Sequence, residues 1–229
     1  MAVLDSFRDG EVLLGRAAAA LSRSRTLGEP SHEDNRAQEG AALIVVQSQT
    51  NPATIRNAIA DLIARGVIER KVAAAYTTFS GSKMLLDALA QSVGDEAFSS
   101  MPKTLVTSLD YSTTEPAALA RWLALDNVTV RIAGANALAD GVTTPTRAFH
   151  PKVYAFRADD QTSGVLVTSA NLTGRGLTAN VEAGWLQQRV PSADVDIAFS
   201  MMCEDTETLT EDMVKQYEHV RSASRTSVP

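Results

Sequence analysis

The chain has 229 residues, of which 45% are hydrophobic and 21% charged, and it contains one cysteine. This size suits one globular domain with appendages, and a single cysteine excludes an internal disulfide or a multi-cysteine zinc site. The formal net charge of −6 argues against a surface built to coat nucleic acid, because that task calls for a basic surface. No apolar run approaches the roughly 18 residues that span a bilayer, and acids stand where a signal peptide carries basic residues. We therefore expect a cytoplasmic protein without a membrane segment.

The N-terminal part divides into a helix and a break. The first 26 residues, with "VLLGRAAAALSRSR", are rich in helix formers, and the polar stretch from Thr26 to Gly40 follows. We expect an N-terminal helix and linker over residues 1–40, a main domain over 41–190 and an acidic helical segment over 191–229.

From residue 42 onward, strand-like and helix-like segments alternate. Short apolar runs with β-branched residues predict strands at 42–48, 71–79, 103–109 and 127–133. Between them, the segments 51–66, 82–91 and 116–125 predict helices. This alternation is typical of a layered α/β domain. We expect a mixed, largely parallel central sheet with helices on both faces.

The pattern changes after residue 150. "KVYAF" at 152–156 and "GVLVTS" at 164–169 predict two strands, and "RADDQTS" between them suits a hairpin. "ANLTGRGL" at 170–177 predicts a loop or short helical turn, and "VEAGWLQQRV" at 181–190 predicts a last strand. Residues 192–222 predict a partly amphipathic helical segment.

The same region carries polar groups suited to phosphate chemistry. His150 and Lys152 lie two apart on a predicted strand, so their side chains project from the same face. Lysine supplies positive charge to a phosphate oxygen, and histidine supplies a nucleophilic nitrogen or a proton. Ser169 and Asn171 follow the end of a buried strand, and Glu182 is a carboxylate that can orient an imidazole.

Each of these elements also has an ordinary structural explanation. An HxK pair on a strand is common, "SANLTG" suits a helix cap, and Glu182 alone suits a solvated strand position. The ordered set of all of them between His150 and Glu182 favours a phosphodiester site.

Taken together, "HPKVYAF" and "GVLVTSANLTGRGLTANVEAGW" resemble the HxK, SxN and late-Glu signature of the phospholipase D superfamily, most of all its branch of DNA-cutting, restriction-type nucleases. Upstream, "KVAAAYTTFSG", "DYSTTEPAAL" and "NVTVRIA" resemble the segments that precede the motif in that branch. The resemblance covers residues 41–190. It implies a phospholipase D-like fold and a metal-independent endonuclease, without cofactor, that acts in restriction or anti-phage defence.

The resemblance also implies roles for individual residues. His150 is expected to be the nucleophile that forms a phosphohistidine, and Lys152 and Asn171 are expected to bind the phosphate oxygens. Ser169 is expected to be a supporting hydrogen-bond donor, and Glu182 to orient the histidine.

Two positions depart from the family pattern. Arg157 stands where the fullest pattern has an aspartate, and Thr168 stands where a glycine usually precedes the serine. These departures motivate an alternative: a catalytically weak or inactive module that dimerises and binds nucleic acid.

The family's site uses two histidines, whereas this chain has one HxK motif, and neither His32 nor His219 has a lysine two residues later. We therefore expect a homodimer with one composite site.

Residues 121–189 carry 7 Lys and Arg against 5 Asp and Glu, so this part is net basic. Its Arg147, Arg157 and Arg175 are candidate contacts to DNA. The acidic remainder suggests that a partner protein or an additional domain supplies target recognition.

Overall fold

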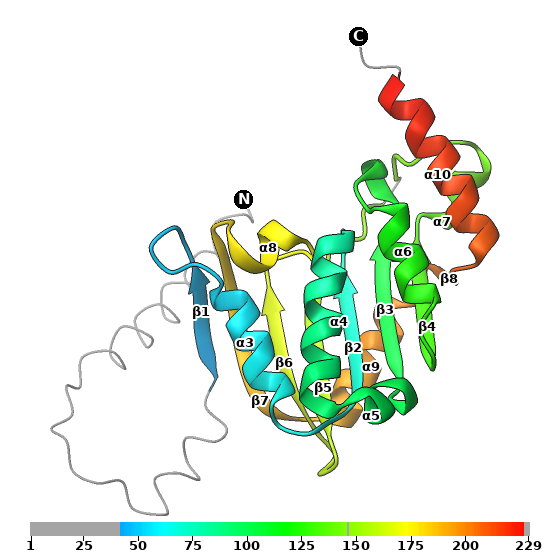
Figure 1. Ribbon diagram of the computed structural model, residues 1–229. Helices are drawn as coiled ribbons and strands as arrows, with labels where there is room; N and C mark the ends of the chain where they lie inside the picture. The colour runs from blue at the N-terminus through cyan, green and yellow to red at the C-terminus, as the bar shows by residue number, and fades with distance from the viewer. Residues whose placement is uncertain (1–41, 146, 227–229) are drawn as a thin grey trace, which may run out of the picture. The chain divides into compact units, whose positions relative to one another are not determined.

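The computed structural model describes residues 42–145 and 147–226 (Figure 1). The N-terminal helix and linker expected over residues 1–40 lie outside the described residues. None of the helices within these ranges is long and apolar enough to cross a membrane.

A sheet of eight strands runs through the described part of the chain, in the order β1-β7-β6-β5-β2-β3-β4-β8. The strands are β1 (Leu43–Gln47), β2 (Val67–Ala74), β3 (Lys103–Ser108), β4 (Val128–Ala133), β5 (Lys152–Ala158), β6 (Thr162–Thr168), β7 (Glu182–Pro191) and β8 (Thr206–Thr208).

The expected mixed sheet is confirmed, but its parallel part is smaller than expected. Only the β2–β3 and β3–β4 pairs are parallel, and the other five neighbouring pairs are antiparallel. The reason is connectivity. Residues 159–161 alone join β5 to β6, whereas a parallel neighbour would need a long crossover.

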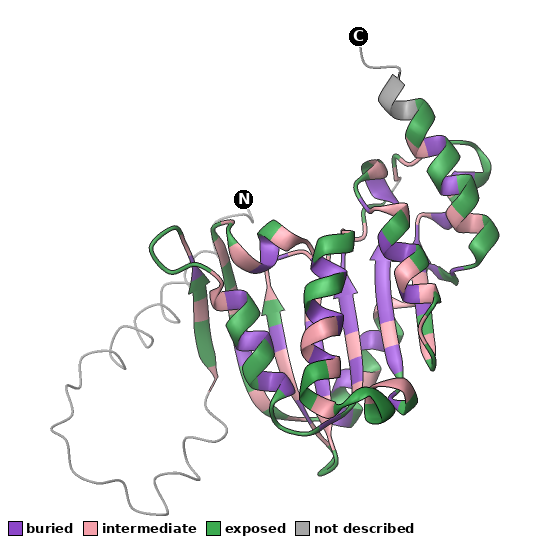
Figure 2. Cartoon of the chain, viewed as in Figure 1, coloured by how far each residue is buried: buried purple, intermediate pink, exposed green. Residues whose placement is uncertain are grey.

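The helices cover both faces of the sheet, as expected. On one face, α3 (Thr54–Ile63), α4 (Phe79–Val93) and α6 (Pro116–Leu123) bury the larger core, and on the other face lies α9 (Ser192–Met202) (Figures 1 and 2). Alternation along β2 shows this division, because Val72 belongs to the larger core whereas Ala73 packs with Phe199 of α9.

Shorter elements complete the fold. They are α5 (Asp95–Ser100), the 3-10 turn η1 (Asp110–Ser112), α7 (Ala135–Ala139), α8 (Gly174–Thr178) and α10 (Glu211–Thr226). The segment expected to be helical over 192–222 is divided by β8, which pairs with β4. Arg131 of β4 explains this pairing, since its guanidinium donates to the hydroxyls of Thr206 and Thr208 at 3.0 and 2.9 Å.

The start of α4 fixes the turn that follows β6. The Thr78 hydroxyl caps α4 by accepting from Gly81 N–H at 3.2 Å, and Thr78 N–H donates to the Leu172 carbonyl at 3.0 Å. A Cβ on Gly81 would lie 2.3 Å from that carbonyl oxygen. Glycine is therefore required for the close approach that holds the "SANLTG" turn against α4.

Candidate active site

The predicted catalytic and phosphate-binding residues gather at the upper end of the sheet in Figure 1, where β2 and β3 end and β5 begins. Strand β5 is antiparallel to β2, so it starts where β2 finishes: Lys152 pairs with Ala74, and Ala75 N–H donates to the Pro151 carbonyl at 3.0 Å. Strand β6 ends at the same level, which brings the "SANLTG" turn beside the HxK pair.

His150 and Lys152 are in direct contact. The Lys152 Nζ lies 2.7 Å from His150 Nδ1 and 3.1 Å from Nε2, and it donates to the His150 carbonyl at 3.0 Å. The lysine side chain is buried, which lowers its pKa, while the charge of Glu182 opposes this effect. His150 itself is exposed. Which ring nitrogen accepts from the ammonium depends on the tautomer of the imidazole, and a ring nitrogen without a proton is the nucleophilic one.

Ser169 and Glu182 form a second group. The Ser169 hydroxyl donates to Glu182 Oε2, and the Asn180 amide donates to Glu182 Oε1 at 3.3 Å. Ala183 N–H in turn donates to Ser169 Oγ at 3.1 Å. Within the described chain the carboxylate thus bonds to Ser169 and Asn180, and the expected orienting bond to His150 is not formed.

Asn171 is oriented by the loop after β2. Its side-chain oxygen accepts from Tyr76 N–H at 3.0 Å, which leaves the Nδ2 amide group to donate elsewhere. The Tyr76 ring meets the His150 ring edge-on, with centroids 6.1 Å apart and planes at 82°. Tyr76 therefore touches two of the candidate site residues.

Asp110 is a further residue of the site that the sequence reasoning missed. It is 2% exposed, at the end of β3, and its Oδ2 accepts from Phe149 N–H at 3.0 Å. Burial raises the pKa of Asp110, and the Phe149 bond, Ser108 and the charge of His150 partly offset this. A Cβ on Gly134 would lie 3.0 Å from Asp110 Oδ1. An acid directly after the buried run "TLVTSL" was the available signal.

The structure does not bring Arg157, the third candidate DNA contact, to the end of the sheet that holds His150 and Lys152. Arg157 lies toward the other end of β5, where its guanidinium pairs with Glu69 at 2.8 Å and Asp196 at 2.5 Å. The physical reason is strand geometry, because five residues along a strand cover about 16 Å.

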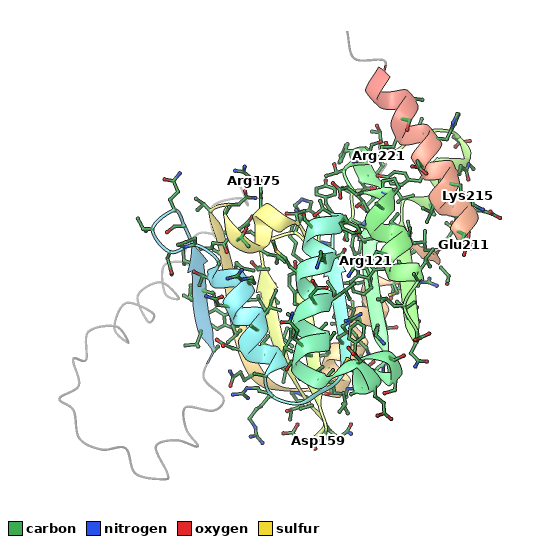
Figure 3. All side chains as sticks on the ribbon, in the orientation of Figure 1. Arg121, Asp159, Arg175, Glu211, Lys215 and Arg221 are labelled. Carbon is green, nitrogen blue, oxygen red and sulfur yellow. The ribbon has the colours of Figure 1, made fainter. Side chains whose placement is uncertain are left out.

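The other two candidate DNA contacts are exposed. Arg175 lies on α8 at the site end of the sheet, opposite the end marked by Asp159 (Figure 3), and its Nε donates to Asn180 Oδ1 at 3.4 Å. Arg147 precedes His150 by three residues and lies 3.5 Å from Asp205.

Thr168 is accommodated by the strands around it. Its hydroxyl donates to the Ala183 carbonyl at 2.8 Å and accepts from Ala170 N–H at 3.2 Å. The hydroxyl therefore ties the end of β6 to β7, and the threonine does not disturb the turn that carries Ser169.

The fold is phospholipase D-like, as expected from the sequence. No protein-family model and no curated protein matches the sequence. Among solved structures, the chain is similar to a phospholipase D family member, Nuc from Salmonella typhimurium, with TM-score 0.52 and 15% identity over 75% of this chain and 100% of that chain. Phosphatidylserine synthase from Haemophilus influenzae Rd KW20 is also similar, with TM-score 0.51 and 15% identity over 81% of this chain and 44% of that chain.

Proposed function

We propose that the protein is a metal-independent phosphodiesterase that cleaves DNA through a covalent phosphohistidine. One observation carries this proposal: the buried Lys152 ammonium lies within 3.1 Å of both ring nitrogens of the exposed His150. The Asn171 amide and the Ser169–Glu182 pair belong to the same end of the sheet.

The reaction would proceed in two displacements. A nitrogen of His150 attacks phosphorus, forming a P–N bond while the bond to the leaving oxygen breaks. Lys152 and the Asn171 amide hold the nonbridging oxygens and stabilise the charge that develops on them. Water then attacks phosphorus and gives its proton to the group that had protonated the leaving oxygen, the P–N bond breaks, and His150 is restored. Ser169 supports this arrangement by holding the Glu182 carboxylate.

The leaving oxygen needs a proton, and the attacking imidazole cannot supply it in the same step. His219, the other histidine of the described ranges, lies on α10 and takes no part in the contacts of the site. We propose that His150 of a second copy supplies the proton, so that a homodimer holds one composite site on its two-fold axis. Among the described residues no carboxylate hydrogen-bonds to the His150 ring, so a second copy would also be able to supply the group that orients it.

DNA is the substrate that the charge distribution favours over phospholipid. The site lies in the net-basic part of the chain, and Arg147 and Arg175 are exposed on the segments that carry it. A net charge of −6 would be repelled by anionic lipid. A role in restriction or anti-phage defence rests on the sequence resemblance, as does target recognition by a partner or further domain.

The alternative of an inactive binding module loses much of its motivation. It depends on Arg157 and Thr168. Arg157 lies away from the site, and the Thr168 hydroxyl is hydrogen-bonded to Ala183 and Ala170 without disturbing the turn.

The decisive experiment measures cleavage of plasmid, single-stranded DNA and RNA in EDTA by wild type and His150→Ala. We expect the wild type to cut DNA and the variant to be inactive. His219→Ala, which removes an exposed histidine outside the site, is the matched control and should cut as wild type does. Cleavage by His150→Ala at the wild-type rate would refute the mechanism.

A further inference from the structure

Tyr111 presents a large aromatic side chain next to the site without packing it into the fold. The residue is 56% exposed, and its backbone has φ 57° and ψ 21°, the left-handed region that bulky residues rarely adopt. Ser112 follows with φ 55°. Neither exposure of the ring nor this backbone conformation stabilises the folded chain, so the fold alone does not account for a tyrosine here.

The loop that carries Tyr111 is held on several sides. Tyr111 N–H donates to the Thr143 carbonyl at 2.7 Å, and the Ser112 hydroxyl bonds to the Thr143 hydroxyl at 2.9 Å. Arg221 of α10 donates to the Ser112 carbonyl at 2.9 Å, and Figure 3 labels this arginine beside the loop end of the sheet. The ring is therefore displayed from an anchored backbone, which lowers the entropy lost when a ligand contacts it.

Tyr111 also lies close to the proposed nucleophile. The ends of β2, β3 and the start of β5 are joined by backbone bonds, from Ser108 N–H to Ala75 at 3.2 Å and from Ala75 N–H to Pro151 at 3.0 Å. Two strand spacings, about 10 Å, therefore separate the Tyr111 loop from the HxK pair. Asp110, the residue before Tyr111, bonds to Phe149, the residue before His150.

We infer that Tyr111 is a stacking platform for an unpaired base beside the scissile phosphate, and that the substrate is single-stranded DNA. This inference rests on the proposed nuclease function. Every base has a flat face that can stack on an exposed tyrosine, whereas bases within a duplex are already stacked and must be extruded first. Stacking also suits a chain with net charge −6, because it supplies affinity that does not depend on a basic surface.

The test uses the His150→Ala background, in which bound DNA is not cut, and measures fluorescence anisotropy of a labelled single-stranded oligonucleotide and its duplex. Tyr111→Asn removes the ring, and asparagine tolerates positive φ, so the loop is kept. We expect Tyr111→Asn to weaken single-strand binding about 5- to 100-fold and duplex binding little, and Tyr111→Phe to bind single strands nearly as the parent does. Val142→Ala trims an exposed apolar side chain next to the loop's Thr143 anchor and should bind as the parent does.

Equal single-strand affinity of Tyr111→Asn and its parent would overturn the inference, and so would equal losses on single-stranded and duplex DNA. The same variants with His150 intact extend the test to cleavage, where Tyr111→Asn should lose its preference for single strands. Failure of the proposed function would look different, because the wild type would then cut no DNA while the binding series still decided the role of Tyr111.

Discussion

Replacement of Arg70 by methionine should stabilise the protein. Arg70 lies on β2 within the larger core and is 0% exposed. Its three guanidinium nitrogens have no hydrogen-bond partner among the described residues. The charge instead faces the rings of Trp122 and Phe98, at 4.9 and 5.3 Å from their centroids. A buried cation without hydrogen-bond partners costs the folded state, and methionine fills similar space without a charge.

The size of the stabilisation expected for Arg70→Met follows from the lowered pKa of Arg70. Burial lowers the pKa of Arg70 to about 9. At about 1.4 kcal/mol for each tenfold change, keeping this guanidinium charged at neutral pH costs about 4–5 kcal/mol. The two ring contacts return about 1–2 kcal/mol each. The remaining gain of up to about 3 kcal/mol should raise Tm by up to about 12 °C in a chain of this length. It should also raise the pKa of Lys103, which burial and then the charge of Arg70 lower.

Thermal and urea denaturation of wild type and Arg70→Met measure this gain. The pKa of Arg70 is lower in the folded state than in the unfolded chain. The destabilisation by its buried charge is therefore complete below pH 9, and it disappears as the pH rises from there toward the ordinary pKa of arginine. The advantage of the variant should therefore be constant from pH 6 to 8 and shrink above pH 9. Arg121→Met is the control, because Arg121, which is labelled in Figure 3, is partly exposed and pairs with Asp87. A lower Tm for Arg70→Met, or a gain equal to that of the control, would refute the reasoning.

Three further predictions concern the site. Asp110→Ala leaves the Phe149 N–H without its buried acceptor, so kcat on a chromogenic phosphodiester should fall about 5- to 100-fold with little change in KM. Asp110→Asn keeps an acceptor oxygen and should have most of the wild-type kcat. A normal kcat in Asp110→Ala would exclude a positioning role. The Lys152 ammonium loses its charge at lower pH than an ordinary lysine, because burial lowers its pKa. Activity should therefore decline on the alkaline side below about pH 10.4, and an alkaline limb at the ordinary lysine value would contradict this. Equal amounts of wild type and His150→Ala can be mixed and allowed to exchange subunits. If each site needs two intact histidines, the mixture should have about one quarter of the activity of the same total amount of wild type. About one half would indicate independent sites.

Much of the fold could be predicted because the spacing of apolar residues along the chain indicates its strands and helices. The strands and helices between residues 42 and 133 follow apolar patterns of period 2 and 3.6, and the structure confirms them with shifted ends. The strand expected at 71–79 instead spans Val67–Ala74, because Thr78 leaves the sheet to cap α4. Short elements such as β8 and α7 carry too few residues to show a period.

Within the site, neighbours along the chain were easier to predict than neighbours across the sheet. The contact of His150 with Lys152 agrees with their spacing of two residues, although β5 begins at Lys152 and His150 precedes the strand on which it was expected. The bond from Asp110 to Phe149 depends on where two distant segments meet, and no local pattern contains that information. The partner of Glu182 was likewise set by the pairing of β6 with β7, which places Ser169 beside it.

The arrangement of the sheet separates two kinds of evolutionary change. The proposed chemical groups all lie in a single stretch that runs from His150, just before β5, to Glu182, the first residue of β7. The loop with Tyr111 follows β3, on the parallel half of the sheet, and is encoded some distance upstream. Substitutions or insertions after Asp110 in that loop can therefore alter which nucleic acid is held, while Asp110 keeps its bond to Phe149 and the groups that break the phosphodiester bond keep their geometry. A lineage that retains this sheet could acquire a new target by exchanging the part of this loop that follows Asp110, and the same exchange offers a route to redesign.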